Sequence, residues 1–185
     1  PLPDSCHRRE SYGNGMHNPS DTHADNSERR ILTSFEEVRE AAIEVAACAQ
    51  RSITIMTPDL EPGIYDHPDF LEVVKRLVLA KRYARVRVLV TDPAKTVRNG
   101  NALVALGRRL NTFIDFRNLH EKYRTDIHPA FIIADEGAIL YRIDGRRFDG
   151  IMGTNEPAIA RQYLEGFEQP WEDSDYRHDV RMAHI

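Results

Sequence analysis

The sequence is poor in the features that define disulfide-rich, zinc-binding and membrane-spanning proteins. Only two of its 185 residues are cysteine, Cys6 in a polar segment and Cys48 in an apolar helical pattern. We therefore expect neither a disulfide framework nor a cysteine metal site. The chain contains no run of about 18 apolar residues, which a membrane helix needs, and its start has no apolar signal segment. These absences predict a cytoplasmic protein with no membrane span, no cofactor and no bound metal.

Basic charge is not in excess either. The chain carries 29 acidic and 25 basic residues, so its net charge of −4 gives no global attraction to nucleic acid. A hydrophobic fraction of 41% and a charged fraction of 29% are typical of a soluble globular domain. Net charge does not describe one face of a protein, so a local basic patch is still compatible with this composition. The sequence contains no glycine-rich phosphate loop and no nucleophile elbow.

Three segments differ in composition. Residues 1–30 are polar and lack apolar periodicity, which predicts a disordered leader. Residues 31–174 contain the periodic apolar segments and are expected to form one domain, because a chain of this length has room for a single core. Residues 175–185 are expected to be a frayed tail.

Strands and helices alternate in the first part of the domain. Ser34 and Glu37 form a capping-box pattern, which predicts a helix that begins there and runs to about Gln50. The patterns that follow predict strands at 52–57, 85–90 and 112–117 and helices at 68–82 and 94–109. This order predicts parallel strands that are joined by right-handed crossovers.

The last third of the domain has a different pattern. Strands are expected at 130–134 and 138–143, with a turn at 135–137 between them, so this pair should form an antiparallel hairpin. A strand near 148–153 and a helix from Pro157 to about Phe167 follow, and Trp171 is expected to pack on the core. The predicted fold class is α/β: a mixed, mostly parallel sheet flanked by helices, with a C-terminal antiparallel hairpin.

One motif resembles a family signature. His128, Ala130 and Asp135 have the spacing of His-x-Lys followed by four residues and Asp, which is the signature of the phospholipase D-like superfamily. The expected elements between about Thr33 and Ser174 are also similar in order to one half-domain of that superfamily. The resemblance implies a phospholipase D-like sandwich with a degenerate motif, because Ala130 stands where the family has lysine.

The resemblance also implies roles for individual residues. In active members a histidine attacks phosphorus and a second histidine, from a matching half, protonates the leaving oxygen. His128 would then be the nucleophile, Asp135 a structural carboxylate at the strand end, and Asp149 the group that orients His128. Because the chain has only one such half, the resemblance implies a homodimer. Ordinary structural roles also account for His128, which precedes Pro129, and for Asp135 in a hairpin turn.

Two phosphate-binding parts of the family pattern are missing. Alternate residues of a strand share a face, so His-x-Lys places an imidazole and an ammonium against one phosphate, whereas Ala130 offers no charge. The small-residue and asparagine motif after the hairpin is also absent. Nearby basic residues are candidate replacements as phosphate binders, or alternatively partners of neighbouring carboxylates: Arg117, Lys122, Arg124, Arg142, Arg146 and Arg147.

Three hypotheses about function follow from these observations. The first is a catalytically inactive phospholipase D-like domain that acts as a phosphate-binding, nucleic-acid-binding or assembly module. The second is a divergent metal-independent phosphodiesterase or nuclease that acts as a homodimer through His128. The third is a purely structural dimerisation domain. Ala130 argues against the second hypothesis, because the loss of one transition-state donor often reduces the rate about a hundredfold or more.

Overall fold

The computed structural model describes residues 29–174, except for the side chains of 97–99. Most of the expected leader and the whole of the expected tail lie outside these residues. Arg30, which was expected to belong to the leader, instead begins the first strand.

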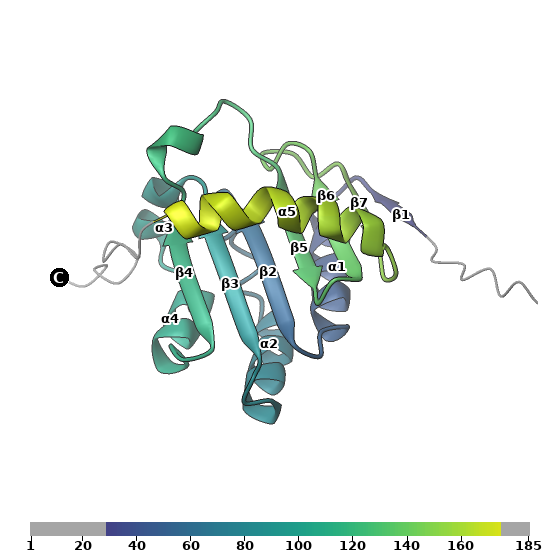
Figure 1. The fold of residues 1–185 in the computed structure, drawn as a ribbon, viewed down its shortest axis with the longest axis vertical. Coiled ribbons are helices and arrows are strands. Elements are labelled where there is room, and N and C mark those ends of the chain that lie inside the picture. The colour runs from purple at the N-terminus through teal and green to yellow at the C-terminus, as the bar shows by residue number, and fades with distance from the viewer. Residues whose placement is uncertain (1–28, 175–185) are drawn as a thin grey trace, which may run out of the picture.

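A seven-stranded mixed sheet forms the centre of the fold (Figure 1), in the order β1-β7-β6-β5-β2-β3-β4. Its strands are β1 (Arg30–Leu32), β2 (Ser52–Thr57), β3 (Arg85–Val90), β4 (Ile114–Asn118), β5 (Ala130–Ala134), β6 (Ala138–Arg142) and β7 (Gly150–Gly153). The α/β class and the antiparallel β5–β6 hairpin are confirmed. One detail is wrong: only β2–β3 and β3–β4 pair in parallel, and the other four pairings are antiparallel. The short connections from β5 to β7 favour antiparallel neighbours, because a parallel pair needs a long crossover.

Helices cover both faces of the sheet. Helix α5 (Pro157–Asp173) crosses the front face in Figure 1, while α1 (Phe35–Ala47) and α2 (Pro68–Ala80) lie behind it. The core accordingly has two parts, a larger one that contains residues of α1 and α2 and a smaller one beneath α5. Trp171 is buried in the smaller part and stacks on Phe167 at a ring-centroid distance of 5.4 Å, which confirms the expected packing.

Local signals explain where several helices begin and end. The capping box of α1 is confirmed: Ser34 Oγ accepts from the backbone N–H of Glu37, and the Glu37 carboxylate accepts from that of Ser34. The helix expected at 94–109 is instead two helices, α3 (Pro93–Asn99) and α4 (Ala102–Arg109). Gly100 separates them with φ of +62°, a backbone conformation that glycine adopts readily and that cannot continue the helix. The Asn101 side chain then caps α4 by accepting from Leu103 N at 2.8 Å.

Two further boundaries differ from expectation. Strand β1 was not predicted, because three residues are too few for an alternating pattern to be recognised; it pairs with β7, which begins at Gly150. Helix α5 continues beyond Phe167 to Asp173 and includes Pro170.

The direction of β5 decides where the functional side chains gather. Because β5 is antiparallel to β2, the N-terminal end of β5 lies at the same edge as the C-terminal ends of β2 and β3. The residues after Thr57 and Val90 and those before Ala130 therefore meet at one edge of the sheet. The turn after β6 reaches the same edge, because Gly145 N donates to His128 O at 2.9 Å.

Candidate functional site

A cavity of about 310 Å³ lies at this edge, and His128 forms part of its wall. The connections after β2 and β3, the segment before β5 and the turn after β6 all contribute to its lining. Its titratable groups besides His128 are three basic side chains, Lys95, Arg124 and Arg146, and two acidic ones, Asp92 and Asp126. The cavity therefore has a small excess of positive charge.

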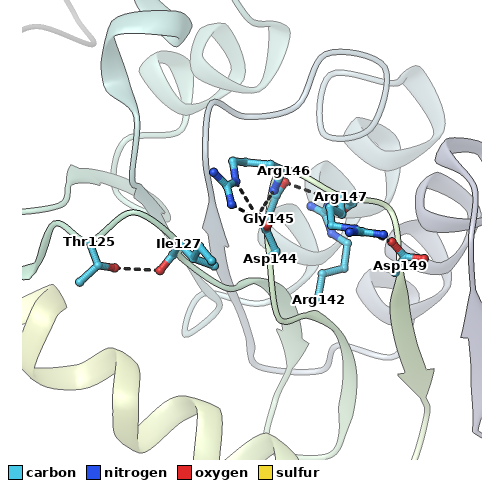
Figure 2. A network of polar contacts seen from close by, with 8 residues as sticks. All are labelled: Thr125, Ile127, Arg142, Asp144, Gly145, Arg146, Arg147 and Asp149. Carbon is cyan, nitrogen blue, oxygen red and sulfur yellow. Dashed lines mark hydrogen bonds and ion pairs between the residues drawn. The ribbon is translucent and has the colours of Figure 1, made fainter.

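His128 is half-buried and faces this cavity in its neutral form. Burial lowers its pKa below the ordinary value of 6.5, and the positive charge of Arg124 lowers it further. Nε2 of the ring accepts a hydrogen bond from Thr125 N at 3.1 Å. A neutral imidazole that accepts at Nε2 carries its proton on Nδ1. The Nε2 lone pair is thus already engaged by the backbone. Thr125 is itself fixed, since its hydroxyl donates to Ile127 O at 2.8 Å (Figure 2).

The three cations of the cavity differ in how far they are neutralised. Arg146 donates to both oxygens of Asp144, at 2.9 and 2.8 Å, and this pairing lowers the pKa of Asp144 to about 2. Lys95 lies 3.4 Å from Asp92. Within residues 29–174, Arg124 has no ion-pair partner. Arg124 is therefore the cation best placed to attract an external anion.

Ala130 stands in a crowded place. The strand register aligns it with Arg142 of β6, and continuing the β2–β5 pairing by one residue aligns it with Thr57. Ala130 is buried, and a Cβ added to Gly145 would lie 3.0 Å from the Ala130 Cβ and 2.9 Å from Pro58 Cγ. Gly145 therefore lies close to both Ala130 and Pro58, and of these three residues only Gly145 and Pro58 line the cavity.

Arg142 is buried beside Ala130 rather than exposed in the cavity. Its Nη2 lies 2.5 and 2.6 Å from the two carboxylate oxygens of Glu61, and both side chains are almost fully buried. Burial raises the pKa of Glu61, and the Arg142 guanidinium opposes that shift. The sequence placed Arg142 among the phosphate binders, but the structure assigns its charge to an internal carboxylate. Glu61 was missed, although Arg142 follows Ala138 and Leu140 on the core-facing side of β6, where a cation requires a buried partner.

Three other candidate phosphate binders lie away from the cavity. Arg117 is on the α5 side of the sheet, where its Nη1 donates to Trp171 O at 2.8 Å and its guanidinium lies over the Trp171 ring. Lys122 pairs with Asp173 at 2.7 Å. Arg147 pairs with Asp149 at 2.9 Å, and both line a second cavity of about 380 Å³ beside β1 (Figure 2). Of the six candidates, only Arg124 and Arg146 line the His128 cavity.

The two carboxylates that the motif singled out are not close partners of His128. Asp135 accepts three backbone N–H groups, those of Gln50, Arg51 and Ser52, at 2.8 to 2.9 Å. It thereby fixes the connection between α1 and β2 at the opposite end of β5. Asp149 is exposed on the second cavity, and the described residues show no hydrogen bond or ion pair between it and His128. Nor do residues 29–174 contain a cluster of three potential metal-ligating His, Cys, Asp or Glu side chains.

Residues 34–182 match the family that is described only as a domain of unknown function, DUF7931. The chain belongs to this family. No curated protein sequence matches it. The described helices include none that is both long and apolar enough to cross a membrane.

Solved structures show how this member of the family folds. Nuc from Salmonella typhimurium, a phospholipase D family member, is similar at a TM-score of 0.56 and 18% identity, covering 80% of this chain and 97% of Nuc. NucT from Helicobacter pylori is similar at 0.55 and 12%, covering 81% and 99%. TrmBL2, an archaeal chromatin protein that binds DNA, is similar at 0.57 and 13%, covering 85% of this chain and 57% of TrmBL2. The domain therefore has a phospholipase D-like fold.

Proposed function

We propose that this domain binds a phosphate-containing ligand in the His128 cavity without cleaving it. The buried alanine at position 130 is the observation that carries this proposal. A phosphodiesterase of the phospholipase D-like type has a second cationic donor beside its histidine, whereas here that position holds the buried Ala130, which offers no charge and does not line the cavity. The neighbouring cation, Arg142, is bound to Glu61 instead.

Two observations favour an anionic ligand. Arg124 lines the cavity without an internal ion-pair partner among the described residues, and Arg146 lies in the same wall. Arginine binds phosphate oxygens well, because its planar guanidinium offers parallel N–H donors. The similarity to TrmBL2 favours nucleic acid as the source of the phosphate. DNA is therefore the first macromolecular ligand to test.

The second candidate function is a phosphodiesterase or nuclease that acts as a homodimer through His128. The position of His128 in a cavity with two arginines favours it. The hydrogen bond from Thr125 N to Nε2 opposes it, because a nucleophilic nitrogen needs a free lone pair. The two functions differ in one outcome: only the second changes the ligand covalently.

Substitution of Arg124 by alanine should weaken the binding of inorganic phosphate about tenfold, since the contact that is lost is charge-assisted. Isothermal titration of the wild type and the variant measures the change. Arg161→Ala, an exposed arginine on α5 outside the cavity, is the matched control and should bind as the wild type does. Equal affinities of Arg124→Ala and the wild type would rule out this cavity as the phosphate site.

Binding of a phosphodiester should strengthen as the pH falls below about 6.5, because His128 then becomes a cation beside the ligand. The free protein should become less stable over the same range, since the unfolded chain takes up the proton more readily than half-buried His128 does. Fluorescence anisotropy of a labelled oligothymidylate between pH 5 and 8 (roughly the range over which histidine titrates) measures the affinity. In His128→Gln, which has no titrating ring, this pH dependence should disappear; an unchanged profile would show that another group causes it.

A further inference from the structure

We propose that Glu61 and Arg142 are positioning residues that hold both His128 and Arg146 at the phosphate cavity. This inference rests on the function proposed above. Neither side chain lines the cavity, and we assign them no contact with the ligand. Their effect is transmitted through the backbone of the turn that follows β6.

A continuous chain of polar contacts leads from Glu61 to His128. The Glu61 carboxylate accepts from Arg142 Nη2, and Arg142 Nη1 donates to Gly145 O at 3.3 Å. Gly145 N in turn donates to His128 O at 2.9 Å. Each link joins a different part of the fold: Glu61 lies between β2 and α2, Arg142 ends β6, and His128 precedes β5. The buried pair thus ties three connections together at the edge where the cavity forms.

The same guanidinium fixes the backbone on both sides of Arg146. Arg142 Nη1 also donates to Arg147 O at 2.7 Å, so it anchors the carbonyl groups of both neighbours of Arg146 (Figure 2). The side chain of Arg146 is oriented separately by Asp144. Because Arg142 binds the main chain on both sides of Arg146, Arg146 keeps a fixed position in the cavity wall.

Burial makes this arrangement sensitive to change. Arg142 Nη2 donates to both oxygens of the Glu61 carboxylate, and the Thr57 hydroxyl also donates to Oε2 at 3.2 Å. In a poorly solvated interior such contacts are stronger than in water, and a missing partner is correspondingly costly. The turn itself packs tightly, since even a methyl group on Gly145 would overlap with Pro58. Loss of the Arg142 donors should therefore make the whole turn mobile, because its tight packing leaves no room for a small shift to a new position.

A double variant, Glu61→Leu with Arg142→Met, separates positioning from stability. Replacing a buried ion pair by apolar residues of similar size often preserves the fold, whereas removing one partner does not. We expect the double variant to unfold at a urea concentration close to that of the wild type. We also expect its affinity for inorganic phosphate to fall on the order of tenfold, the effect of losing a charge-assisted contact.

Hydrogen exchange of the Gly145 amide, measured by NMR without ligand, gives a second readout that does not depend on binding. Exchange should become faster in the double variant, while the Val88 amide in central strand β3 stays protected. The matched control is Arg87→Met with Glu168→Leu, which removes another doubly hydrogen-bonded pair, one outside the cavity. This control should change neither the phosphate affinity nor the exchange of Gly145.

The two readouts make different failures distinguishable. A folded double variant that binds phosphate as the wild type does and protects Gly145 equally well would overturn the positioning role. If the wild type itself binds no phosphate, the proposed function fails. Hydrogen exchange then decides the positioning role by itself. That role fails as well if the Gly145 amide is protected as strongly in the double variant as in the wild type.

Discussion

The variant Arg142→Met should be less stable than the wild type by about 3 to 5 kcal/mol, because it leaves the Glu61 carboxylate buried without its cation. Both side chains are almost completely inaccessible, so solvent cannot take over the role of the lost partner. Urea unfolding followed by the fluorescence of Trp171, the single tryptophan of the chain, measures the difference. Burial raises the pKa of Glu61 and the variant removes the opposing charge, so the deficit should shrink as the pH falls.

Arg146→Met is the control for this effect. Arg146, four residues after Arg142, also donates two hydrogen bonds to a carboxylate, that of Asp144, but its side chain is 60% exposed. Exposed pairs contribute roughly 0 to 1 kcal/mol, so this variant should remain close to the wild type. Equal losses in the two variants would contradict the view that burial makes the Glu61–Arg142 pair important.

Restoring the family's lysine by Ala130→Lys should not create hydrolytic activity. Ala130 is buried and lies close to Gly145, so a lysine at this position should overpack against the turn after β6. Overpacking of this kind costs about 1 to 3 kcal/mol, and the ammonium would also enter a region that already contains the Arg142 cation. Urea unfolding and release of p-nitrophenol from a phosphodiester substrate measure the two effects.

Ala158→Lys provides the comparison for this substitution. It adds the same side chain at an exposed position of α5, where surface changes usually alter stability by less than about 0.5 kcal/mol. If Ala130→Lys were as stable as Ala158→Lys and hydrolysed the substrate, position 130 would tolerate the family's lysine and the proposal of binding without cleavage would need only this one substitution to be reversed.

Local patterns were sufficient to predict most of the fold. The capping box at Ser34 and the turn at 135–137 are formed by residues close in sequence, so their chemistry can be recognised without the fold. Gly100 shows the limit of this reasoning. Apolar periodicity continues past it, but its positive φ breaks the helix, and a glycine in a sequence does not reveal which φ it adopts.

The candidate site was harder to predict, because its contacts join distant parts of the chain. Glu61 and Arg142 are 81 positions apart, and only the fold brings them together. Arg147 directly follows Arg146 in sequence, yet Arg147 and Asp149 line the other cavity. The sequence named His128, Arg124 and Arg146 among its candidates, and the structure brings these three to one cavity. The sequence could not show which of the neighbouring cations are already neutralised.

Hydrolysis of bis(p-nitrophenyl) phosphate and single-stranded DNA, measured without added metal for the wild type and His128→Ala side by side, tests most directly whether this cavity binds phosphate without cleaving it. We expect no product from either protein, together with DNA binding by the wild type that His128→Ala weakens. Product formation by the wild type that is lost in His128→Ala would contradict the proposed function and establish the phosphohistidine mechanism instead.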